Sequence, residues 1–401
     1  MKSMKDLKDW KKPLKKYSFL PLMICTFLTT LVAENNYLST TKQDILNYSY
    51  EKAVQDGKKL KNDWINPITY KYIYSNTDDT TKSMISISQP IFKSGGIYYT
   101  IKYANSVTSQ TNAGIGIQKK ELIKQTINLF YQIKQIDIAV KKQKLLVKNA
   151  LLDVERKKEQ VLNGILDTSF LNNSILALNE NQNLLIDLEY KRKTFILDLS
   201  KLSDQRYGEL ELPVLTLLDY NQYMTKNIYI QKAKDDIKTA YWLKNMTRSS
   251  YFPTINLTAD YSKYHETNND TAFSKDGIEN YGFNITIPLD IKYSYSVQSS
   301  KIEYLKIKAS LHDKKREEQI IFEHSLAKIE SLNKKIIIAK SDIKLYDSLV
   351  AQIQEQLNVG MKTKSDLEII QNSQNIKSLD IESINIDKQI ELLEIYYRME
   401  I

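Results

Sequence analysis

The sequence predicts a mainly α-helical fold with a small β part, built as a duplicated unit of helix, hairpin, long helix, turn and helix. Three observations predict it. The 401 residues include only 10 glycines and 7 prolines, too few for many short loops. Two stretches of about 60 residues lack proline and have a helical pattern. A strand-like segment precedes each stretch, with Pro90 near the end of one and Pro288 near the end of the other.

The N-terminus is typical of a secretory signal peptide over residues 1–33. Seven lysines between Lys2 and Lys16 precede the apolar run FLPLMICTFLTTLVA, which ends at a candidate cleavage point, Ala33. An uncleaved membrane anchor is the alternative. The only cysteine, Cys25, lies in this run, so the exported part is expected to form no disulfide and no cysteine metal site. Its net charge falls from +9 to +4, which removes most of the support for a nucleic-acid partner.

The first structural repeat is expected over residues 34–204. A short helix over 35–62 leads to two strands, at about 68–75 and 84–92, which alternate apolar and polar residues and form a hairpin. A long helix follows over about 97–162, which corresponds to roughly 100 Å. The segment NGILDTS then reverses the chain, with Asp167 or Thr168 as N-cap of a helix to about Leu202. Residues 205–226 are expected to be a linker.

The second repeat is expected over residues 227–401 in the same order. A helix to about Ser249 precedes strands at about 254–264 and 281–290, and a long helix covers about 297–357. The chain then reverses at NVGMKTKS, and a final helix ends it. Pro90 and Pro288 are 198 positions apart, and Gly164 and Gly360 are 196 apart. This near-constant offset predicts the duplication.

Helices of this length must pack side by side, because they cannot wrap around a compact core. Apolar residues recur at alternating spacings of three and four, as in a coiled-coil seam, at Ile343, Tyr346, Val350, Ile353 and Leu357. No segment after Ala33 has 18 consecutive apolar residues, so no membrane-spanning helix is expected.

The four strands allow two interpretations. Their length and alternation suit transmembrane β-strands with a polar lumen face. They suit equally a soluble four-stranded sheet packed on the helices. Four strands cannot close a barrel, and hydrocarbon does not tolerate open sheet edges. The membrane interpretation therefore requires several copies of the chain to combine their strands.

The sequence resembles the TolC family of bacterial outer-membrane efflux proteins. The resemblance rests on SISQPIFKSGG and ITIPLDIKYS before the long helices, YFPTINLTADYS at the third strand, and QLNVGMKTKSDLEIIQNS with its partner VLNGILDTSFLNNS. It covers essentially the whole mature chain. The resemblance implies a homotrimer with a 12-stranded barrel in the outer membrane of a Gram-negative bacterium, continued by an α-helical barrel through the periplasm.

The resemblance also implies candidate pore-entrance residues at the second reversal, where the tunnel would narrow: Asp366, Glu368 and Lys362, with Asp167 at the first reversal. A ring of three Asp366 carboxylates would select cations. The alternatives are that Asp366 is a charge favoured at a helix start, that Lys362 is simply solvated, and that Asp167 is an N-cap.

Three further sets of residues follow from the resemblance. The reversals are the expected docking turns for a periplasmic adaptor, at Asn163, Gly164, Asn358 and Gly360. Strands and helices would join at Pro90, Gly95, Gly96 and Pro288, with Lys292-Tyr293-Ser294 as the counterpart of Ser94-Gly95-Gly96. Interface aromatics, or ordinary strand tyrosines, are Tyr70, Tyr72, Tyr74, Tyr261 and Tyr281.

No catalytic or cofactor site is expected. His312 and His324 lie twelve positions apart, so they lack the spacing of a metal-binding pair on a helix. His265 is expected on a loop and has no partner at ligand spacing either. Gly114 and Gly116 lack the third glycine of a phosphate-binding loop.

The sequence thus predicts a passive export duct that works with a periplasmic adaptor and a proton-driven or ATP-driven inner-membrane transporter. The alternative is a secreted or surface coiled-coil protein, structural or adhesive, with no channel. The exported substrate is left open between drugs, metal ions and proteins.

Overall fold

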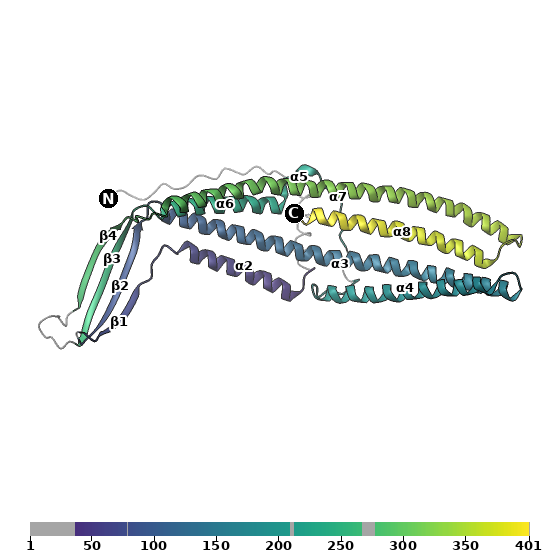
Figure 1. Ribbon diagram of the computed structural model, residues 1–401, viewed down its shortest axis with the longest axis horizontal. Coiled ribbons are helices and arrows are strands. Elements are labelled where there is room, and N and C mark those ends of the chain that lie inside the picture. The colour runs from purple at the N-terminus through teal and green to yellow at the C-terminus, as the bar shows by residue number, and fades with distance from the viewer. Residues whose placement is uncertain (1–36, 78, 209–211, 267–276, 401) are drawn as a thin grey trace, which may run out of the picture.

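The computed structural model describes residues 37–77, 79–208, 212–266 and 277–400. The signal peptide expected over residues 1–33 lies outside the described residues. Helices form a long rod, with a four-stranded sheet at one end and two helix-to-helix turns at the other (Figure 1).

Seven helices and four strands are described in chain order. They are α2 (Thr40–Lys61), β1 (Thr69–Ser75), β2 (Thr80–Phe92), α3 (Gly96–Leu162), α4 (Thr168–Ser200), α5 (Tyr220–Lys226), α6 (Ile228–Ser249), β3 (Thr254–Glu266), β4 (Ile278–Thr286), α7 (Tyr293–Asn358) and α8 (Lys364–Tyr396). None of these helices combines the length and apolarity needed to cross a membrane.

The two long helices, α3 and α7, run the whole length of the rod, and shorter helices pack beside them in pairs (Figure 1). On the sheet side of the rod α2 contacts α3, and α6 lies between α3 and α7. On the turn side α4 contacts α3, and α8 lies between α3 and α7. Each half is therefore one layer, four helices wide, with α2 and α4 along one edge and α7 along the other.

The core lies near mid-length, where α3, α4, α8 and the segment before α5 meet. Ile123, Ile127, Phe130 and Ile133 of α3 are almost completely buried there, together with Leu393 of α8. The seam residues from Ile343 to Leu357 are only half-buried. The apolar contact therefore weakens from mid-length toward the turns.

The sheet has the order β1-β2-β3-β4, with every neighbouring pair antiparallel. The central β2–β3 pair joins the two halves of the chain, and β1 and β4 are the edges. The sheet does not pack on the helices: its substantial contacts are strand to strand, and those of the helices are helix to helix. The interpretation of a sheet covered by helices is therefore wrong for the described residues.

Several element ends differ from the sequence-based expectation. β2 begins at Thr80, four residues early, because it pairs as far as Ser75 of β1. Pro90 lies inside β2, beside an irregularity in its pairing with β3, so it does not end the strand. β4 ends at Thr286, opposite Thr254, and Pro288 lies beyond it. The neighbouring Pro253 has no N–H to extend the ladder. The expected linker contains the helix α5.

Candidate functional site

The two turns at the far end of the rod have the same geometry. At the first, Gly164 has a φ of 71°, and the Ile165 N–H donates to the Gln160 carbonyl. At the second, Gly360 has a φ of 78°, and the Met361 N–H donates to the Gln356 carbonyl. Nothing lies within 4 Å of a Cβ built on either glycine. Both turns are therefore open, and glycine is needed for its backbone conformation.

The predicted turn residues lie at this end, and apolar side chains surround them. Asn163 is the C-cap of α3, Asn358 is the last residue of α7, and the Asp167 carboxylate accepts from the Ser169 N–H as the N-cap of α4. The side chains of Leu162, Ile165, Val359 and Met361 are all more than two-thirds exposed. Exposed apolar clusters of this kind are typical of interaction surfaces.

Asp366 is held from two sides at the second turn. Its carboxylate accepts from the backbone N–H of Thr363 at 3.1 Å, and the Thr363 hydroxyl accepts from the Asp366 N–H, which completes a capping box. The Arg156 guanidinium of α3 lies 3.3 Å from the same carboxylate. The helix-start role therefore holds for Asp366, and the acid also faces another helix of its own chain.

These contacts set the charge at the second turn. The Thr363 backbone hydrogen bond lowers the pKa of Asp366; the Thr363 hydroxyl, Lys362 and Arg156 act in the same direction, against burial. Lys362 itself is exposed. Burial acts to raise the pKa of Asp153, but hydrogen bonds from Lys157 and Arg156 outweigh it and lower that pKa. Both carboxyl groups are ionised at neutral pH.

A series of polar contacts continues from this turn along α3 and α8. Each ion pair joins a base of α3 to an acid of α8: Lys148 pairs with Glu368, Lys142 with Asp380 at 2.5 Å, and Lys124 with Glu394 at 3.3 Å. Gln135 donates to Asp387 between them. Most of these groups are partly exposed, so each pair contributes about 1 kcal/mol or less. Glu368, a predicted pore-entrance residue, belongs to this α3–α8 seam.

The sheet presents one apolar face that no other described element of the chain covers. The strand registers place the predicted tyrosines on this face together with Ile85, Leu257, Phe283 and Ile285. The five tyrosines, Tyr70, Tyr72, Tyr74, Tyr261 and Tyr281, are between 39% and 87% exposed. The opposite face carries mainly Thr, Ser, Asn, Lys and Asp. Removing a large apolar side chain from water gains about 1.5–3 kcal/mol, so the bare face is a strong site for association.

The sheet joins the helices through a tight turn in the first half of the chain. Gly95 is the N-cap of α3 with a φ of 83°, and Gly96 is buried, where a Cβ would lie 3.1 Å from the Ser249 hydroxyl. In the second half, Asp290 accepts from the Lys292 N–H, and Lys292 has ordinary helical geometry. The two junctions therefore differ, as the sequence indicates.

A buried carboxylate near mid-length was not predicted. Glu318 of α7 is fully buried and accepts from the Tyr223 hydroxyl at 2.7 Å, the Asn227 amide at 2.9 Å and the Arg398 guanidinium at 3.0 Å. Burial and Glu318 both raise the pKa of Tyr223, so the phenol stays protonated. The cluster fastens α5, the start of α6 and the C-terminal segment to α7.

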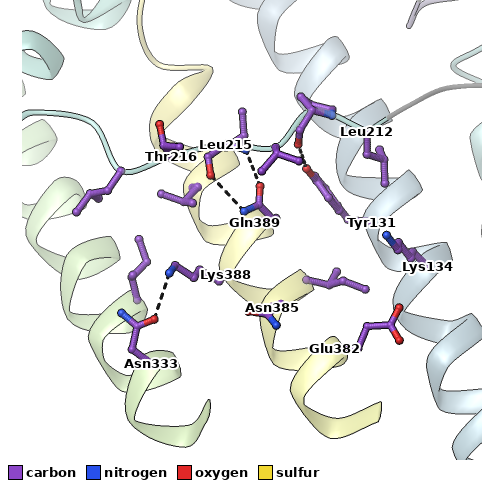
Figure 2. Close-up of a pocket in the computed structure, with 16 residues that line it drawn as sticks. Tyr131, Lys134, Leu212, Leu215, Thr216, Asn333, Glu382, Asn385, Lys388 and Gln389 are labelled. Carbon is purple, nitrogen blue, oxygen red and sulfur yellow. Dashed lines mark hydrogen bonds between the residues drawn. The ribbon is translucent and has the colours of Figure 1, made fainter. Parts of the chain in front are cut away.

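A pocket of about 600 Å³, open to solvent, lies under the segment before α5 (Figure 2). Gln389 of α8 binds this segment through both backbone groups of Leu215, at 2.7 and 3.2 Å, and the Tyr131 hydroxyl donates to the Pro213 carbonyl. Burial raises the pKa of Tyr131 to about 12, so its hydroxyl stays a donor. These hydrogen bonds hold the segment before α5 in place over the pocket.

No protein-family model matches the chain, and no curated protein matches it. Solved structures do. The outer membrane protein VceC of Vibrio cholerae has a TM-score of 0.71 at 12% identity, covering 92% of this chain and 95% of that one. The Campylobacter jejuni CmeC outer membrane channel has a TM-score of 0.69 at 12% identity, covering 92% of this chain and 84% of that one. The Neisseria gonorrhoeae MtrE outer membrane channel, in its open state, has a TM-score of 0.70 at 13% identity, covering 92% of this chain and 88% of that one.

These neighbours are TolC-family outer-membrane channels. The resemblance found in the sequence is confirmed at the level of the fold, which is what likeness at such low identity establishes.

Proposed function

We propose that this chain, whose fold is that of outer-membrane efflux channels, is one protomer of a homotrimeric exit duct in the outer membrane of a Gram-negative bacterium. The uncovered apolar face of the sheet is the observation that carries the proposal. A single four-stranded sheet of this kind is unstable in water, because its apolar face is bare, and unstable in lipid, because its two edges are open. It becomes stable when the face meets hydrocarbon and the edges meet other copies.

Three copies provide the closure that the family resemblance implies. Joining β4 of one copy to β1 of the next gives a barrel of twelve antiparallel strands, above the minimum of eight for a closed membrane barrel. β2 and β3 have 13 residues each, which exceeds the ~9–11 residues that cross hydrocarbon. The two remaining strands are shorter and form the edges.

The helical layer supports the same head-to-tail association. Its α4 edge exposes Leu176, Ile186 and Tyr190, and its α7 edge exposes Ile337, Ile338 and Leu345. These edges differ from each other, so copies join α4 to α7 of the neighbour and close a ring by rotation. The ring is a periplasmic helical tunnel, continuous with the barrel.

The duplicated unit is part of this proposal. The long helices α3 and α7 have 67 and 66 residues, and α4 and α8 have 33 each. Two such units per chain give the trimer approximate sixfold repetition in the tunnel, which suits a ring of matching partners at the turns.

The duct is proposed to be passive: it catalyses no reaction and needs no cofactor. A periplasmic adaptor is proposed to cap the exposed apolar turns around Gly164 and Gly360, and to couple the duct to a proton-driven or ATP-driven inner-membrane transporter. The pore entrance is proposed to lie at the second turn, where Asp366, Glu368 and Lys362 set the charge of the narrowing.

The test uses inter-chain disulfides at the sheet edges. The only native cysteine is Cys25, so a Cys25→Ser background has no thiol. Lys71→Cys on β1, combined in turn with Asn280→Cys or Asn284→Cys on β4, is expected to give covalent trimers after oxidation in membranes. Met84→Cys with Thr258→Cys on the central strands is the matched control and is expected to give none.

Ion conductance of the purified protein in planar bilayers is the second measurement. A water-soluble monomer with no conductance and no inter-chain disulfide at any edge pair would refute the duct.

A further inference from the structure

Aromatic and basic side chains gather where the helices meet the sheet. A basic–aromatic collar is formed here by Tyr98 and Lys102 of α3, by Tyr241, Trp242, Lys244 and Arg248 of α6, and by Tyr304 of α7. Lys102 lies six residues into α3, or about 9 Å from its first residue, and α6 ends one residue after Arg248. With Tyr304 eleven residues into α7, the whole collar lies within about 17 Å of the helix ends that adjoin the sheet, and Figure 1 shows these ends next to the strands.

The rings of the collar touch one another across three helices. The Tyr98 and Trp242 rings lie 5.9 Å apart edge to face, Tyr241 lies 4.9 Å from Trp242, and the Tyr241 and Tyr304 rings lie 5.9 Å apart. Tyr98 and Tyr241 remain exposed. Amphipathic rings of this kind are enriched where a protein passes from hydrocarbon to water.

Each cation of the collar lies over a ring and not beside an acid. Lys102 lies 5.5 Å from the centre of the Tyr98 ring, Lys244 lies 4.8 and 4.7 Å from those of Tyr241 and Tyr304, and Arg248 lies 5.7 Å from that of Phe252. Among the described residues, none of the three has a carboxylate partner. This differs from the α3–α8 seam, where the bases are neutralised by acids.

The surrounding sequence leaves the positive charge in excess. Residues 92–105, 240–253 and 287–304, which flank the junction, hold six basic side chains and two acidic ones, whereas the four strands hold three of each. Of the two acids, Asp290 accepts from the Lys292 N–H just before α7, and Glu303 pairs with Lys306. The charge of the chain thus changes at the end of the sheet, from balanced to basic.

A cavity of about 260 Å³ between α3 and α6 opens beside these cations, and Lys102 and Trp242 line it. Its one acid, Asp235, already binds Lys238 at 2.9 Å and accepts from Ser109. An anionic group that entered this cavity would meet an ammonium and an indole, with the carboxylate occupied.

We infer that the basic–aromatic collar binds the headgroups of anionic phospholipids in the leaflet that faces the helical rod. The inference rests on the proposed function, since the apolar sheet face must lie in hydrocarbon for the collar to reach the headgroup layer. The rings lie at the membrane–water interface. The cations, which have no carboxylate partner, attract the lipid phosphates, and each cation raises the affinity roughly fivefold near a charged surface. The collar thereby fixes the depth at which the sheet sits.

Trp242 itself provides the test. The chain has three tryptophans, so Trp10→Phe with Trp64→Phe leaves Trp242 as the only one. This variant is reconstituted in a series of bilayers with increasing mole fractions of brominated phosphatidylglycerol or brominated phosphatidylcholine, with bromine near the glycerol end of the chains. We expect phosphatidylglycerol to quench Trp242 at a mole fraction on the order of a hundredfold lower than phosphatidylcholine, because the three contributions of about fivefold multiply.

Two triple variants assign the preference. The first combines Lys102→Gln, Lys244→Gln and Arg248→Gln, and it is expected to remove the preference for phosphatidylglycerol. The matched control, Lys334→Gln, Lys335→Gln and Lys340→Gln on the turn half of α7, makes the same charge change at exposed positions and is expected to keep it. Equal quenching by the two lipids, with conductance intact, would overturn the collar and leave the duct standing. Absence of quenching by either lipid, together with absence of conductance, would overturn both.

Discussion

The Arg156 guanidinium of α3 lies 3.3 Å from the Asp366 carboxylate of α8, and Asp366 also closes the capping box of its own helix with Thr363. One acid thus links the turn between α7 and α8 to the neighbouring hairpin. Because the contact lies at the end of the rod, where the apolar seam is weakest, it restrains how far the two hairpins separate.

Arg156→Gln removes the cation and leaves the capping box intact. We expect a larger single-channel conductance in planar bilayers, because α8 is less restrained, and a loss of at most about 1 kcal/mol in stability, because the pair is partly exposed. Lys157→Gln is the matched control, since Lys157 pairs only with Asp153 within α3. Equal conductance in the two variants would show that the Arg156–Asp366 contact does not restrain the turn.

Acid is expected to weaken the same restraint, but only at low pH. The pKa values of Asp366 and Asp153 lie below their ordinary value of 3.8 in the folded chain. Their stabilising contribution is therefore complete above pH 3.8 and is lost as the pH falls through the lowered values. Conductance is expected to be constant from pH 7 to 5 and to rise below 3.8. A midpoint near pH 6 would exclude these carboxyl groups as its source.

The buried Glu318 cluster is expected to carry a large coupling energy. Glu318→Leu leaves Arg398, whose side chain is only 18% exposed, without its carboxylate partner, which costs on the order of 3 kcal/mol. Arg398→Leu leaves the carboxylate without its main cation and is expected to cost a similar amount. The double variant is expected to be much less destabilised than the sum of the two. Denaturant unfolding of all four proteins measures this, and strict additivity would contradict a coupled pair.

Glycines in two settings are expected to respond oppositely to alanine. Gly360 has a φ of 78°, so Gly360→Ala imposes a left-handed conformation on a residue with a Cβ and is expected to cost about 1–2 kcal/mol. Gly114 lies within α3 with nothing within 4 Å of a built Cβ, so Gly114→Ala is expected to stabilise the chain by about 0.5–1 kcal/mol. Melting temperatures of both variants test this, and a shift of the same sign in each would contradict it.

The long helices and the apolar face of the sheet were accessible from the sequence because both depend on periodicity. Strand ends were less accessible. Thr80 to Lys82 carry no apolar alternation, so only their pairing with β1 identifies them as strand. Ile287 and Leu289 continue the alternation of β4, yet the strand stops because its partner β3 begins only after Pro253.

The two features that sequence reasoning missed had readable signals. Asp219 precedes α5 and accepts from the N–H groups of Asn221 and Gln222, an N-cap pattern that a search for helix starts would find. Glu318 occupies the seam that continues through Phe322, Ser325, Ile329 and Leu332, at spacings of four and three. A carboxylate at a seam position indicates a buried partner, but the identity of Arg398, 80 positions away, depends on the fold.

The unbroken course of α3 and α7 has a mechanical consequence. Their shorter companions change at mid-length, from α2 to α4 and from α6 to α8, while the two long helices continue without interruption. A continuous helix resists twisting, so a rotation imposed on α3 or α7 at the turns is expected to be transmitted along the helix to the end that joins the sheet.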